Sequence, residues 1–463
     1  MATSSEIYVE LVELSGHVVA KGAWSATLRA NCLYLSAHLA KPGRRCRLLQ
    51  GTWEITPFTP LAALDLSSGT CIQVVWLSSS AADRFSYSNA FVAIKADGSV
   101  VTWGEADSGG NSSAVAPLLT EGVVQVCGTA GAFAAIKADG SVVTWGGAEY
   151  GGNSSAVAPL LKEGVVQVCG TSGAFAAIKA DGCVVTWGEA DLGGNSSAVA
   201  PLLTEGVVQV CGTAGAFAAI KADGCVVTWG GAEYGGNSSA VAPLLKEGIV
   251  QVRGTNGAFA AIKADDSVVT WGEADLGGNS SAVAPLLTEG VVQVCGTASA
   301  FAAIKADGSV VTWGGAEYGG NSSAVAPLLT EGVVQVCGTA SAFAAIKADG
   351  SVVTWGGAEY GGNSSAVAPL LKEGVVHVCG TGDAFAAIKA DGCVVTWGEA
   401  DLGGNSSAVA PLLKEGIVQV RGTNGAFAAI KADGSVVTWG EADSGGNSSA
   451  VAPLLTEGVV QVC

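Results

Sequence analysis

Histidine and charge are scarce in this 463-residue sequence. Charged residues make up 13% of it, and its three histidines are His17, His38 and His377. Histidines this few and this far apart argue against a histidine metal site and against a histidine base that recurs along the chain. No other catalytic constellation stands out, so we expect a protein that is not an enzyme and that binds no cofactor and no metal.

Long apolar runs are also missing. Although 49% of the residues are hydrophobic, no run approaches the roughly 20 apolar residues that a transmembrane helix needs. Residues 2–20 contain Glu6, Glu10 and Glu13 and lack the basic start and apolar centre of a secretory signal. We therefore expect no membrane contact and no secretion, and we assign the protein to the cytoplasm, with the nucleus as the alternative.

Closely spaced cysteine pairs are absent, although the sequence has 13 cysteines. None lies in a C-x-x-C motif, and a disulfide framework is typical of secreted proteins, so we interpret the cysteines as reduced, small and buried apolar residues. Most occupy two repeated positions: Cys127, Cys169, Cys211, Cys295, Cys337, Cys379 and Cys463 at the first, and Cys183, Cys225 and Cys393 at the second. Arg253 and Arg421 replace cysteine at the first position, which therefore accepts a side chain other than a thiol.

Basic residues are outnumbered, and the imbalance lies in one part of the chain. The formal net charge is −18. Residues 1–85 carry seven Lys and Arg against six Asp and Glu, whereas residues 86–463 carry 15 against 34. An acidic surface of this extent repels phosphate backbones, which argues against nucleic acids as direct partners. It favours solubility or a basic protein partner.

The dominant positive feature is a strict repeat of 42 residues. Its clearest stretch is AFAAIKADGSVVTWG at residues 132–146. A constant period of about 40 residues, built from strand-like segments, is typical of β-propellers and solenoids. The nine copies are marked by Phe91, Phe133, Phe175, Phe217, Phe259, Phe301, Phe343, Phe385 and Phe427, and by Trp103, Trp145, Trp187, Trp229, Trp271, Trp313, Trp355, Trp397 and Trp439.

Each repeat predicts three antiparallel strands. In the second repeat they cover residues 123–127, 132–138 and 141–146. Asp139-Gly140 predicts a two-residue hairpin turn in which both residues have positive φ. The fifth repeat has Asp265-Asp266 at this place, and losing the glycine is expected to strain the turn by roughly 1 kcal/mol.

The remainder of the repeat allows two structures. Gly151-Gly152 predicts a loop. Ser154 or Ser155 is then expected to cap a short helical turn that ends at Gly164, and Pro159 argues against a long helix. An extended outer segment is the alternative, and the sequence does not separate the two.

The first 77 residues predict a small α+β domain. Strands are expected at 7–11, 18–20, 47–51 and 70–77, with a turn at Ser15-Gly16, and an amphipathic helix at 25–40, where Leu28, Cys32, Leu35 and Leu39 recur at helical spacing. Residues 78–89 are small and polar, which predicts a linker. The expected organisation is therefore a domain at 1–77, a linker at 78–89 and the repeat array at 90–463.

The repeats resemble those of the regulator-of-chromosome-condensation family. In that family a valine-rich strand leads through a glycine to an apolar strand, an Asp-Gly turn, a strand ending in Trp-Gly and a Tyr-Gly loop. The matching residues of the second repeat are Asp139, Gly140, Trp145, Gly146, Tyr150 and Gly151. The resemblance covers residues 90–463 and implies a mainly β fold, a β-propeller of nine three-stranded repeats. The 42-residue unit is shorter than the family's usual repeat and is closer to the bacterial β-lactamase-inhibiting propeller of the same superfamily.

The two ends of the array favour a closed ring. The first repeat has polar residues up to 89 where a valine-rich strand is expected, and residues 459–463 form such a strand. If the last strand completes the first repeat, neither edge of the array stays exposed. An open superhelix is the alternative, because nine repeats exceed the usual four to eight blades of a propeller.

The N-terminal domain resembles ubiquitin-like β-grasp domains. The resemblance rests on the order of its elements and on the stretches RLLQG at 47–51 and CIQVVWL at 71–77. Ser78 follows Leu77 where conjugated ubiquitins have a Gly-Gly end, so the resemblance implies a fused adaptor that is not conjugated. Leu49 best matches the family's partner-binding strand. A cap for the repeat array is the alternative role of this domain.

Candidate partner-binding residues lie in the loops after each Trp-Gly pair. Five of these loops contain Glu-Ala-Asp, and four contain Gly-Ala-Glu-Tyr. We expect their carboxylates to form an acidic rim that suits a basic peptide, since two per loop are too few for Ca²⁺, which takes about 6–8 oxygen ligands. The tyrosines are the expected aromatic anchors. The candidates are Glu105, Asp107, Tyr150, Glu189, Asp191, Tyr234, Glu273, Asp275, Tyr318, Tyr360, Glu399 and Asp401, with Leu49 in the N-terminal domain.

These features favour a non-catalytic scaffold or adaptor with protein partners. The two resemblances together imply ubiquitin-pathway or regulatory assembly, although the sequence holds no catalytic HECT segment of a ubiquitin ligase. One alternative is a guanine-nucleotide exchange factor for a small GTPase, the best-known role of the repeat family. That activity needs an inserted wedge, whereas every repeat here is 42 residues long. A second alternative is a propeller-type protein inhibitor that is anchored by the tyrosines.

Overall fold

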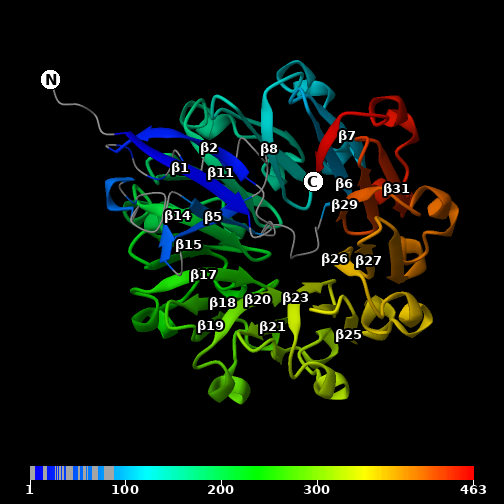
Figure 1. Ribbon diagram of the computed structural model, residues 1–463. Helices are drawn as coiled ribbons and strands as arrows, with labels where there is room; N and C mark the ends of the chain where they lie inside the picture. The colour runs from blue at the N-terminus through cyan, green and yellow to red at the C-terminus, as the bar shows by residue number, and fades with distance from the viewer. Residues whose placement is uncertain are drawn as a thin grey trace. The chain divides into compact units, whose positions relative to one another are not determined.

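The chain divides into two compact units, Met1–Ala82 and Asp83–Cys463 (Figure 1). The computed structural model describes residues 6–13, 18–26, 28, 30, 33, 36–37, 45–50, 53–55, 59, 61–64, 71–77 and 88–463. The division between the units falls inside the segment 78–89 that the sequence predicts as a linker. Among the described residues, no helix has both the length and the apolar character needed to cross a membrane.

The N-terminal unit is built on one mixed five-stranded sheet. Its strands are β1 (Glu6–Glu13), β2 (Val18–Ser25), β3 (Arg45–Gln50), β4 (Trp53–Ile55) and β5 (Cys71–Leu77), and its 3-10 helix is η1 (Leu61–Ala63). The strand order is β2-β1-β5-β3-β4, with β1 parallel to β5 and the other neighbours antiparallel. The four predicted strands are confirmed. β4 was not predicted, because three residues are too few for an alternating pattern to show.

The buried face of this sheet follows the alternation of its apolar residues. Ile7, Val9 and Leu11 on β1 are buried, as the alternation predicts. Ile72 and Val74 on β5 belong to the same apolar cluster. Side chains two residues apart in a strand lie on one face, so the parallel pair β1 and β5 presents one continuous apolar surface to the core.

The helix predicted at 25–40 is partly wrong. Ser25 is the last residue of β2, and Leu28, which the prediction placed on the apolar face, is exposed. Leu33, Ser36 and Ala37 are helical, and Leu33 and Ala37 are buried one turn apart. The predicted positions Cys32, Leu35 and Leu39, and the predicted turn at Ser15-Gly16, lie outside the described residues.

Nine three-stranded antiparallel sheets make up the second unit, as the repeat predicts. We number them 1 to 9 by the order of their middle strands. The middle strands are β6 (Ala90–Lys95), β9 (Ala132–Lys137), β12 (Ala174–Lys179), β15 (Ala216–Lys221), β18 (Ala258–Lys263), β21 (Ala300–Lys305), β24 (Ala342–Lys347), β27 (Ala384–Lys389) and β30 (Ala426–Lys431). The third strands are β7 (Val100–Gly104), β10 (Val142–Gly146), β13 (Val184–Gly188), β16 (Val226–Gly230), β19 (Val268–Gly272), β22 (Val310–Gly314), β25 (Val352–Gly356), β28 (Val394–Gly398) and β31 (Val436–Gly440).

The first strand of each sheet carries the valine-rich stretch. In sheets 2 to 9 these strands are β8 (Val123–Gly128), β11 (Val165–Gly170), β14 (Val207–Gly212), β17 (Ile249–Gly254), β20 (Val291–Gly296), β23 (Val333–Gly338), β26 (Val375–Gly380) and β29 (Ile417–Gly422). In sheet 1 this place is taken by the last strand of the chain, β32 (Val459–Val462), which pairs antiparallel with β6. The red end of the chain accordingly lies beside β6 in Figure 1.

Two short helical segments follow each third strand. The first ones are η2 (Ala106–Gly110), η4 (Ala148–Tyr150), η6 (Ala190–Leu192), η8 (Ala232–Tyr234), η10 (Ala274–Leu276), η12 (Ala316–Tyr318), η14 (Ala358–Gly362), η16 (Ala400–Gly404) and η18 (Ala442–Gly446). The second ones are 3-10 helices: η3 (Ser113–Leu118), η5 (Ser155–Leu160), η7 (Ser197–Leu202), η9 (Ser239–Leu244), η11 (Ser281–Leu286), η13 (Ser323–Leu328), η15 (Ser365–Leu370), η17 (Ser407–Leu412) and η19 (Ser449–Leu454).

These 3-10 helices settle the choice left open by the sequence in favour of a short helical turn. The predicted cap is wrong, because Asn153 rather than a serine side chain accepts the hydrogen bond from the backbone N–H of Ser155 (3.0 Å). Ser154 instead shares a hydrogen bond with the hydroxyl of Thr144 on the third strand (2.9 Å). The helix ends at Leu160, four residues before the predicted end. The asparagine is the better cap because its longer side chain reaches the N–H two residues on.

The hairpin turn between the middle and third strands also differs from the prediction. In sheet 2 the backbone N–H of Gly140 bonds to the carbonyl of Lys137 (2.8 Å), and only Gly140 has positive φ (76°). The turn therefore needs one left-handed residue rather than the two of the predicted type. In sheet 5 Asp266 occupies this place with φ 63°, and it is the single non-glycine residue with positive φ in the described residues.

A tryptophan from each sheet holds the neighbouring sheet. In sheet 2 the Trp145 ring stacks on Phe133, its partner across the hairpin, with 5.6 Å between ring centroids. The Nε1–H of Trp145 donates to the carbonyl of Gly109 in sheet 1 (2.9 Å). The same bond joins Trp103 of sheet 1 to Gly445 of sheet 9 (3.0 Å). Each apolar cluster of the array accordingly combines residues of two successive sheets.

Candidate functional site

The strands of each sheet connect at two opposite ends. In sheet 2 one end holds the link 129–131 and the loop 147–152, which are joined by a hydrogen bond from Gly147 N to Gly131 O (2.8 Å). The other end holds the hairpin turn 138–141 and the link 162–164 that leads to sheet 3. We call the residues equivalent to 129–131 and 147–152 in all nine sheets the loop face, and those equivalent to 137–141 and 162–164 the turn face.

A line of backbone hydrogen bonds holds the loop face together from sheet to sheet. In each step the N–H of one link donates to the carbonyl of the next, over 2.7–3.0 Å. The line runs through Ala130, Ser172, Ala214, Asn256, Ala298, Ala340, Gly382, Asn424 and Ser88. Because only backbone atoms take part, the side chains of the loop face can vary while the loops keep their places.

In sheets 2 to 9 a threonine at the start of the link fixes the loop that follows the third strand. In sheet 2 the hydroxyl of Thr129 donates to the carbonyl of Tyr150 (2.9 Å) and accepts from the N–H of Ala132 (3.0 Å). The equivalent hydroxyls donate to the carbonyl of Leu192 in sheet 3, from Thr171, and to the carbonyl of Ser444 in sheet 9, from Thr423. The framework therefore holds the backbone at this position and accepts tyrosine, leucine or serine there.

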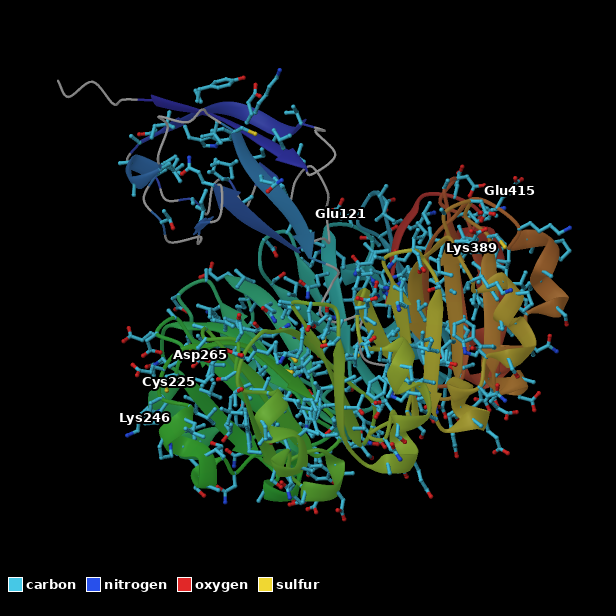
Figure 2. All side chains as sticks on the ribbon, turned by 60° about the horizontal axis from the view of Figure 1, so that its bottom comes forward. Glu121, Cys225, Lys246, Asp265, Lys389 and Glu415 are labelled. Carbon is cyan, nitrogen blue, oxygen red and sulfur yellow. The ribbon has the colours of Figure 1, made fainter. Side chains whose placement is uncertain are left out.

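Charge divides sharply between the two faces. The loop face carries the carboxylates Glu105, Asp107, Glu149, Glu189, Asp191, Glu233, Glu273, Asp275, Glu317, Glu359, Asp383, Glu399, Asp401, Glu441 and Asp443, and it carries no Lys or Arg. All lysines of residues 88–463 lie on the turn face, where nine end the middle strands and Lys162, Lys246, Lys372 and Lys414 lie in the links. Figure 2 labels six turn-face residues, among them Lys246, Asp265 and Glu415. The loop face is thus wholly acidic, whereas the turn face mixes both signs.

The two loop variants have a steric cause that the sequence analysis missed. In sheet 2 a Cβ on Gly147 would lie 2.8 Å from Cδ2 of Tyr150, because the tyrosine ring folds back over the start of its own loop. Gly231, Gly315 and Gly357 meet their own tyrosines in the same way. A loop with tyrosine therefore needs glycine at its first position, and a loop with leucine or serine accepts glutamate there. The signal was present in the sequence as the strict pairing of glycine with tyrosine.

The predicted acidic residues differ in whether hydrogen bonds hold their carboxylates. Glu105 accepts hydrogen bonds from the hydroxyl of Ser108 (2.7 Å) and the amide of Asn89 (3.0 Å), which lower the pKa of its carboxyl. Glu441 accepts from Ser444 in the same way (2.6 Å). These two glutamates are held in their loops. Asp107, Glu189, Asp191, Glu273, Asp275, Glu399 and Asp401 are exposed on the loop face.

The four predicted tyrosines lie on the loop face but in two different settings. Tyr150 and Tyr234 occur in sheets 2 and 4, whose neighbours carry Glu-Ala-Asp loops, and Tyr234 is half-buried against an apolar cluster. Tyr318 and Tyr360 occur in consecutive sheets, 6 and 7, and their side chains are 41% and 40% exposed. Sheets 6 and 7 are thus the place where two tyrosine loops are neighbours.

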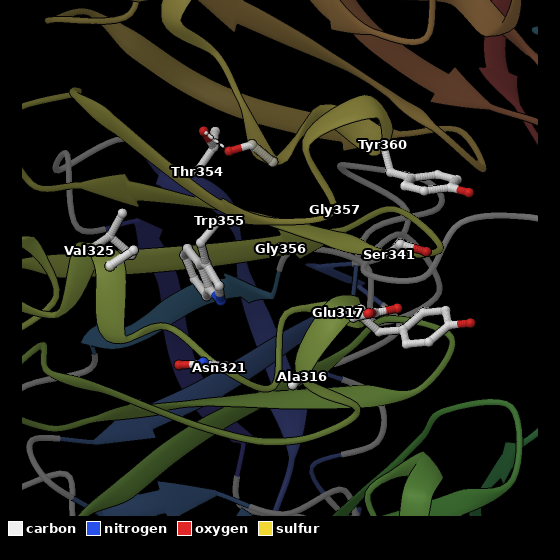
Figure 3. Close-up of a pocket in the computed structure, with 13 residues that line it drawn as sticks. Ala316, Glu317, Asn321, Val325, Ser341, Thr354, Trp355, Gly356, Gly357 and Tyr360 are labelled. Carbon is white, nitrogen blue, oxygen red and sulfur yellow. Dashed lines mark hydrogen bonds between the residues drawn. The ribbon is translucent and has the colours of Figure 1, made fainter.

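A hollow of about 580 Å³ lies between these two loops. Glu317 and Tyr318 line it from sheet 6, and Ser341, Trp355 and Tyr360 line it from sheet 7. In Figure 3 the Ser341 hydroxyl lies between the Tyr360 ring and the Glu317 carboxylate. The hollow therefore combines aromatic rings with an unneutralised carboxylate.

Two further observations concern residues away from the loops. Leu49 lies on β3, opposite Glu54 of β4 and Gln73 of β5, and its side chain is outside the described residues. Burial, and the nearby charge of Glu399, raise the pKa of the Asp383 carboxyl. In the part of the chain that the structure describes, no three His, Cys, Asp or Glu side chains gather to hold a metal ion.

The cysteines of the array lie mainly within the first strands. Cys295, Cys337 and Cys379 are buried, and the equivalent Cys127 is half-buried. Burial raises the pKa of the Cys127 thiol to about 12. None of the cysteines whose side chains are described forms a disulfide.

Comparison with known proteins gives partial matches of fold. No family model and no curated protein match the chain. Among solved structures, the CRINKLY WD40 ectodomain of the Arabidopsis thaliana receptor kinase ACR4 is 15% identical and matches over 62% of this chain and 93% of that one, with a TM-score of 0.34. Yeast RCC1 (Prp20), in a complex with Kap60, is 15% identical and matches over 57% and 79%, with a TM-score of 0.38. Human WBSCR16 is 16% identical and matches over 58% and 90%, with a TM-score of 0.35. The strand pairing described above, rather than these partial matches, defines the fold.

Proposed function

We propose that this protein is a non-catalytic interaction scaffold whose loop face binds basic segments of partner proteins. The observation that carries the proposal is the division of charge, because every lysine of the array lies on the turn face and the loop face has carboxylates alone. Like charges held on one surface create a field that attracts a partner of opposite sign and speeds its encounter. The backbone line and the threonine bonds keep the backbone of these loops in place, so little backbone order is lost on binding.

We further propose that the nine sheets close into a ring, which makes the loop face one continuous platform. The pairing of β32 with β6 supports closure, as does the bond from Trp103 to Gly445. The packing of Phe91 and Trp103 against Ala426 and Ile430 repeats the contacts found between other successive sheets. A ring without free edges resists local opening and association through unpaired strands.

For the N-terminal unit we propose a ubiquitin-like adaptor that recruits the scaffold to a ubiquitin-pathway or regulatory assembly. Support comes from the mixed sheet in which the first and last strands are parallel neighbours, and from helical residues between β2 and β3. Binding measured with and without residues 1–82 tests this role, because an adaptor adds partners of its own and a cap changes only the stability of the array.

The main proposal is tested by removing charge from one face at a time. The loop-face variant combines Asp107→Asn, Asp191→Asn, Asp275→Asn, Asp401→Asn and Asp443→Asn. The matched control combines Glu121→Gln, Glu205→Gln, Glu289→Gln, Glu331→Gln and Glu457→Gln on the turn face. Both variants lose five negative charges, so they share one net charge and differ only in where the charge is removed.

The probe is a fluorescein-labelled 12-residue peptide of alternating Arg or Lys and Gly, titrated at low and high salt and followed by fluorescence anisotropy. We expect the loop-face variant to bind about tenfold more weakly, with a smaller salt dependence, and the turn-face control to bind within about twofold of the parent, since screening confines exposed charges to short range. Equal weakening by the two variants would show that net charge alone attracts the peptide, and the proposal would then be wrong.

A further inference from the structure

The hollow between sheets 6 and 7 differs from the rest of the loop face in its sequence. The Gly-Ala-Glu-Tyr loops at 315–318 and 357–360 are separated by one repeat length, whereas the other tyrosine loops alternate with Glu-Ala-Asp loops. The links of the same two sheets carry Ser299 and Ser341, where sheets 2 to 5 have glycine. Of these two serines, Ser341 lines the hollow, together with the tyrosines of both loops.

The serines change where a tyrosine ring can lie. In sheet 2 a Cβ on Gly131 would lie 2.5 Å from Cδ2 of Tyr150, so this ring packs directly on the backbone of the link. Ser341 has a Cβ at the equivalent position, which closes that place to the Tyr360 ring. Ser341 therefore fills space over the link that the Tyr150 ring occupies in sheet 2, and it adds a hydroxyl to the hollow.

The hollow is lined by one carboxylate, that of Glu317, and by the aromatic rings of Tyr318, Tyr360 and Trp355. The Nε1–H of Trp355 is already used by the carbonyl of Gly319 (2.9 Å), so the indole adds an apolar wall. Glu317 is exposed and supplies a full negative charge. No lysine or arginine lies on the loop face to neutralise it. The unmet requirement of this site is a cation that can also lie flat against a ring.

We propose that the hollow binds the guanidinium group of an arginine side chain on a partner segment that crosses the loop face. A guanidinium is planar, stacks on a tyrosine face and donates two parallel hydrogen bonds to one carboxylate, which suits a hollow lined by Glu317, Tyr318 and Tyr360. A lysine ammonium carries the same charge but neither the plane nor the paired donors. A volume of about 580 Å³ lies within the range of about 300–1,000 Å³ usual for specific pockets and leaves room for the arginine stem and its flanking backbone. This inference rests on the proposed function of the loop face.

The experiment uses three peptides of one sequence, Gly-Ser-rich with four lysines and one central residue that is arginine, lysine or citrulline. Citrulline keeps the shape of arginine without its charge. We expect the full-length protein to bind the arginine peptide about tenfold more tightly than the citrulline peptide and about threefold more tightly than the lysine peptide, measured by fluorescence anisotropy. The ratio of the affinities for the arginine and lysine peptides is the quantity that the variants below are designed to change.

The repeats supply matched control variants. Tyr318→Leu with Tyr360→Leu removes both rings of the hollow, and Tyr150→Leu with Tyr234→Leu removes the two isolated tyrosines. The chain itself has leucine at this position in sheets 3, 5 and 8, so the substitution suits the fold. We expect the first pair to abolish the preference for arginine and the second to leave it unchanged. Tyr318→Phe with Tyr360→Phe should retain it, because the π face remains.

The carboxylate is tested with Glu317→Gln against Glu233→Gln in an isolated tyrosine loop. We expect an approximately fivefold loss of arginine-peptide affinity for the first and less than twofold for the second. An equal loss in both members of either matched pair, or no preference of the parent for arginine over lysine, overturns the site. The loop-face variant with five Asp→Asn substitutions distinguishes a failure of this site from a failure of the proposed function. If the loop face binds basic peptides without preferring arginine, this variant still binds them more weakly than the parent does, and the proposed function stands.

Discussion

The turn face and the loop face are two ends of the same nine sheets, and they use their residues differently. On the turn face Asp139 accepts hydrogen bonds from the N–H (2.9 Å) and hydroxyl (2.7 Å) of Ser141, and most sheets repeat this arrangement or keep its backbone half where cysteine replaces the serine. On the loop face the backbone bonds repeat, while the side chains change between Glu and Gly and between Tyr, Leu and Ser. The turn face therefore repeats its side-chain hydrogen bonds, whereas the loop face varies its side chains on a constant backbone.

The largest expected effect comes from adding one methyl group to each face of sheet 2. Gly151→Ala on the loop face combines positive φ (92°) with a Cβ 2.6 Å from the buried Phe175 ring of sheet 3. Gly164→Ala on the turn face has positive φ (75°) but meets only the Lys179 stem at 3.5 Å. We expect losses of about 2–5 kcal/mol for the first and about 1–2 kcal/mol for the second, measured by urea unfolding.

Equal losses for the two alanine variants would contradict this comparison. They would mean that the backbone conformation alone sets the cost and that the packing of loop-face glycines on the next sheet adds nothing. Because neighbouring repeats stabilise each other, the loop-face variant should also lower the cooperativity of unfolding, which is visible as a shallower transition.

A second prediction concerns the two loop variants. Gly147→Glu places a Cβ 2.8 Å from the Tyr150 ring, so we expect a loss of roughly 1–3 kcal/mol from crowding. Adding Tyr150→Leu gives the loop glutamate at its first position and leucine at its fourth, as in the Glu-Ala-Asp-Leu loop of sheet 3. This second change should recover most of the loss. A double-mutant cycle from urea unfolding of the four proteins gives the coupling energy. Additive effects would show that glycine and tyrosine are paired by common descent of the repeats rather than by contact.

The strands and their order in each repeat follow from the sequence because the period aligns nine copies of one alternating pattern. What the sequence analysis missed depends on single torsion angles and on ring positions. Asp139-Gly140 fits two hairpin turns, and the choice between them rests on hydrogen bonds of Lys137 and Ser141 that no residue type dictates. In the N-terminal unit, where no repeat averages the signal, β4 and the start of the helix were missed.

The candidate site was predictable as a set of loops but not as a hollow. The tyrosines and carboxylates could be named from the sequence, and the structure places them on one face of the sheets. That Tyr318 and Tyr360 line one hollow depends on where the rings lie, and Ser341 joins them from a link 19 residues before Tyr360. Such a relation between separate segments appears only when the chain is folded.

A third prediction concerns the hairpin turn of sheet 5, where Asp266 has positive φ. Asp266→Gly should stabilise the array by about 1 kcal/mol, because glycine takes positive φ without the cost that aspartate bears at φ 63°. The reverse change, Gly182→Asp in sheet 3, should cost at least as much, because a Cβ there would lie 2.5 Å from the backbone N of Gly206. Thermal unfolding of both proteins checks the pair. A destabilised Asp266→Gly protein would mean that the Asp266 side chain makes a compensating contact, and the turn would then not be strained.

The smallest expected effect concerns pH. The contribution of one carboxyl to folding stability changes with pH in opposite directions on the two faces. Burial and Glu399 raise the pKa of Asp383 on the loop face, whereas the hydrogen bonds of Ser141 lower the pKa of Asp139 on the turn face. A raised carboxyl pKa means that the unfolded chain loses this proton more readily, so the folded state loses stability as the pH rises through that pKa. A lowered pKa has the opposite sign, since its stabilisation is present above the ordinary value of 3.8 and is lost as the pH falls.

Asp383→Asn should therefore stabilise the protein at pH 7 by roughly half a kcal/mol, a small value because solvent screens a half-buried carboxylate. At pH 3 the substitution should have no effect, because the side chain at position 383 is neutral in both proteins. Asp139→Ala should instead lower the midpoint of urea unfolding at pH 7 and lose most of this effect under strong acid. Urea unfolding at pH 7 and at pH 3 measures the effect of Asp383→Asn, and unfolding in stronger acid completes the comparison for Asp139→Ala. If Asp383→Asn destabilises at pH 7, its carboxylate has a partner on the loop face, and the view of that face as unneutralised acid would fail at this sheet.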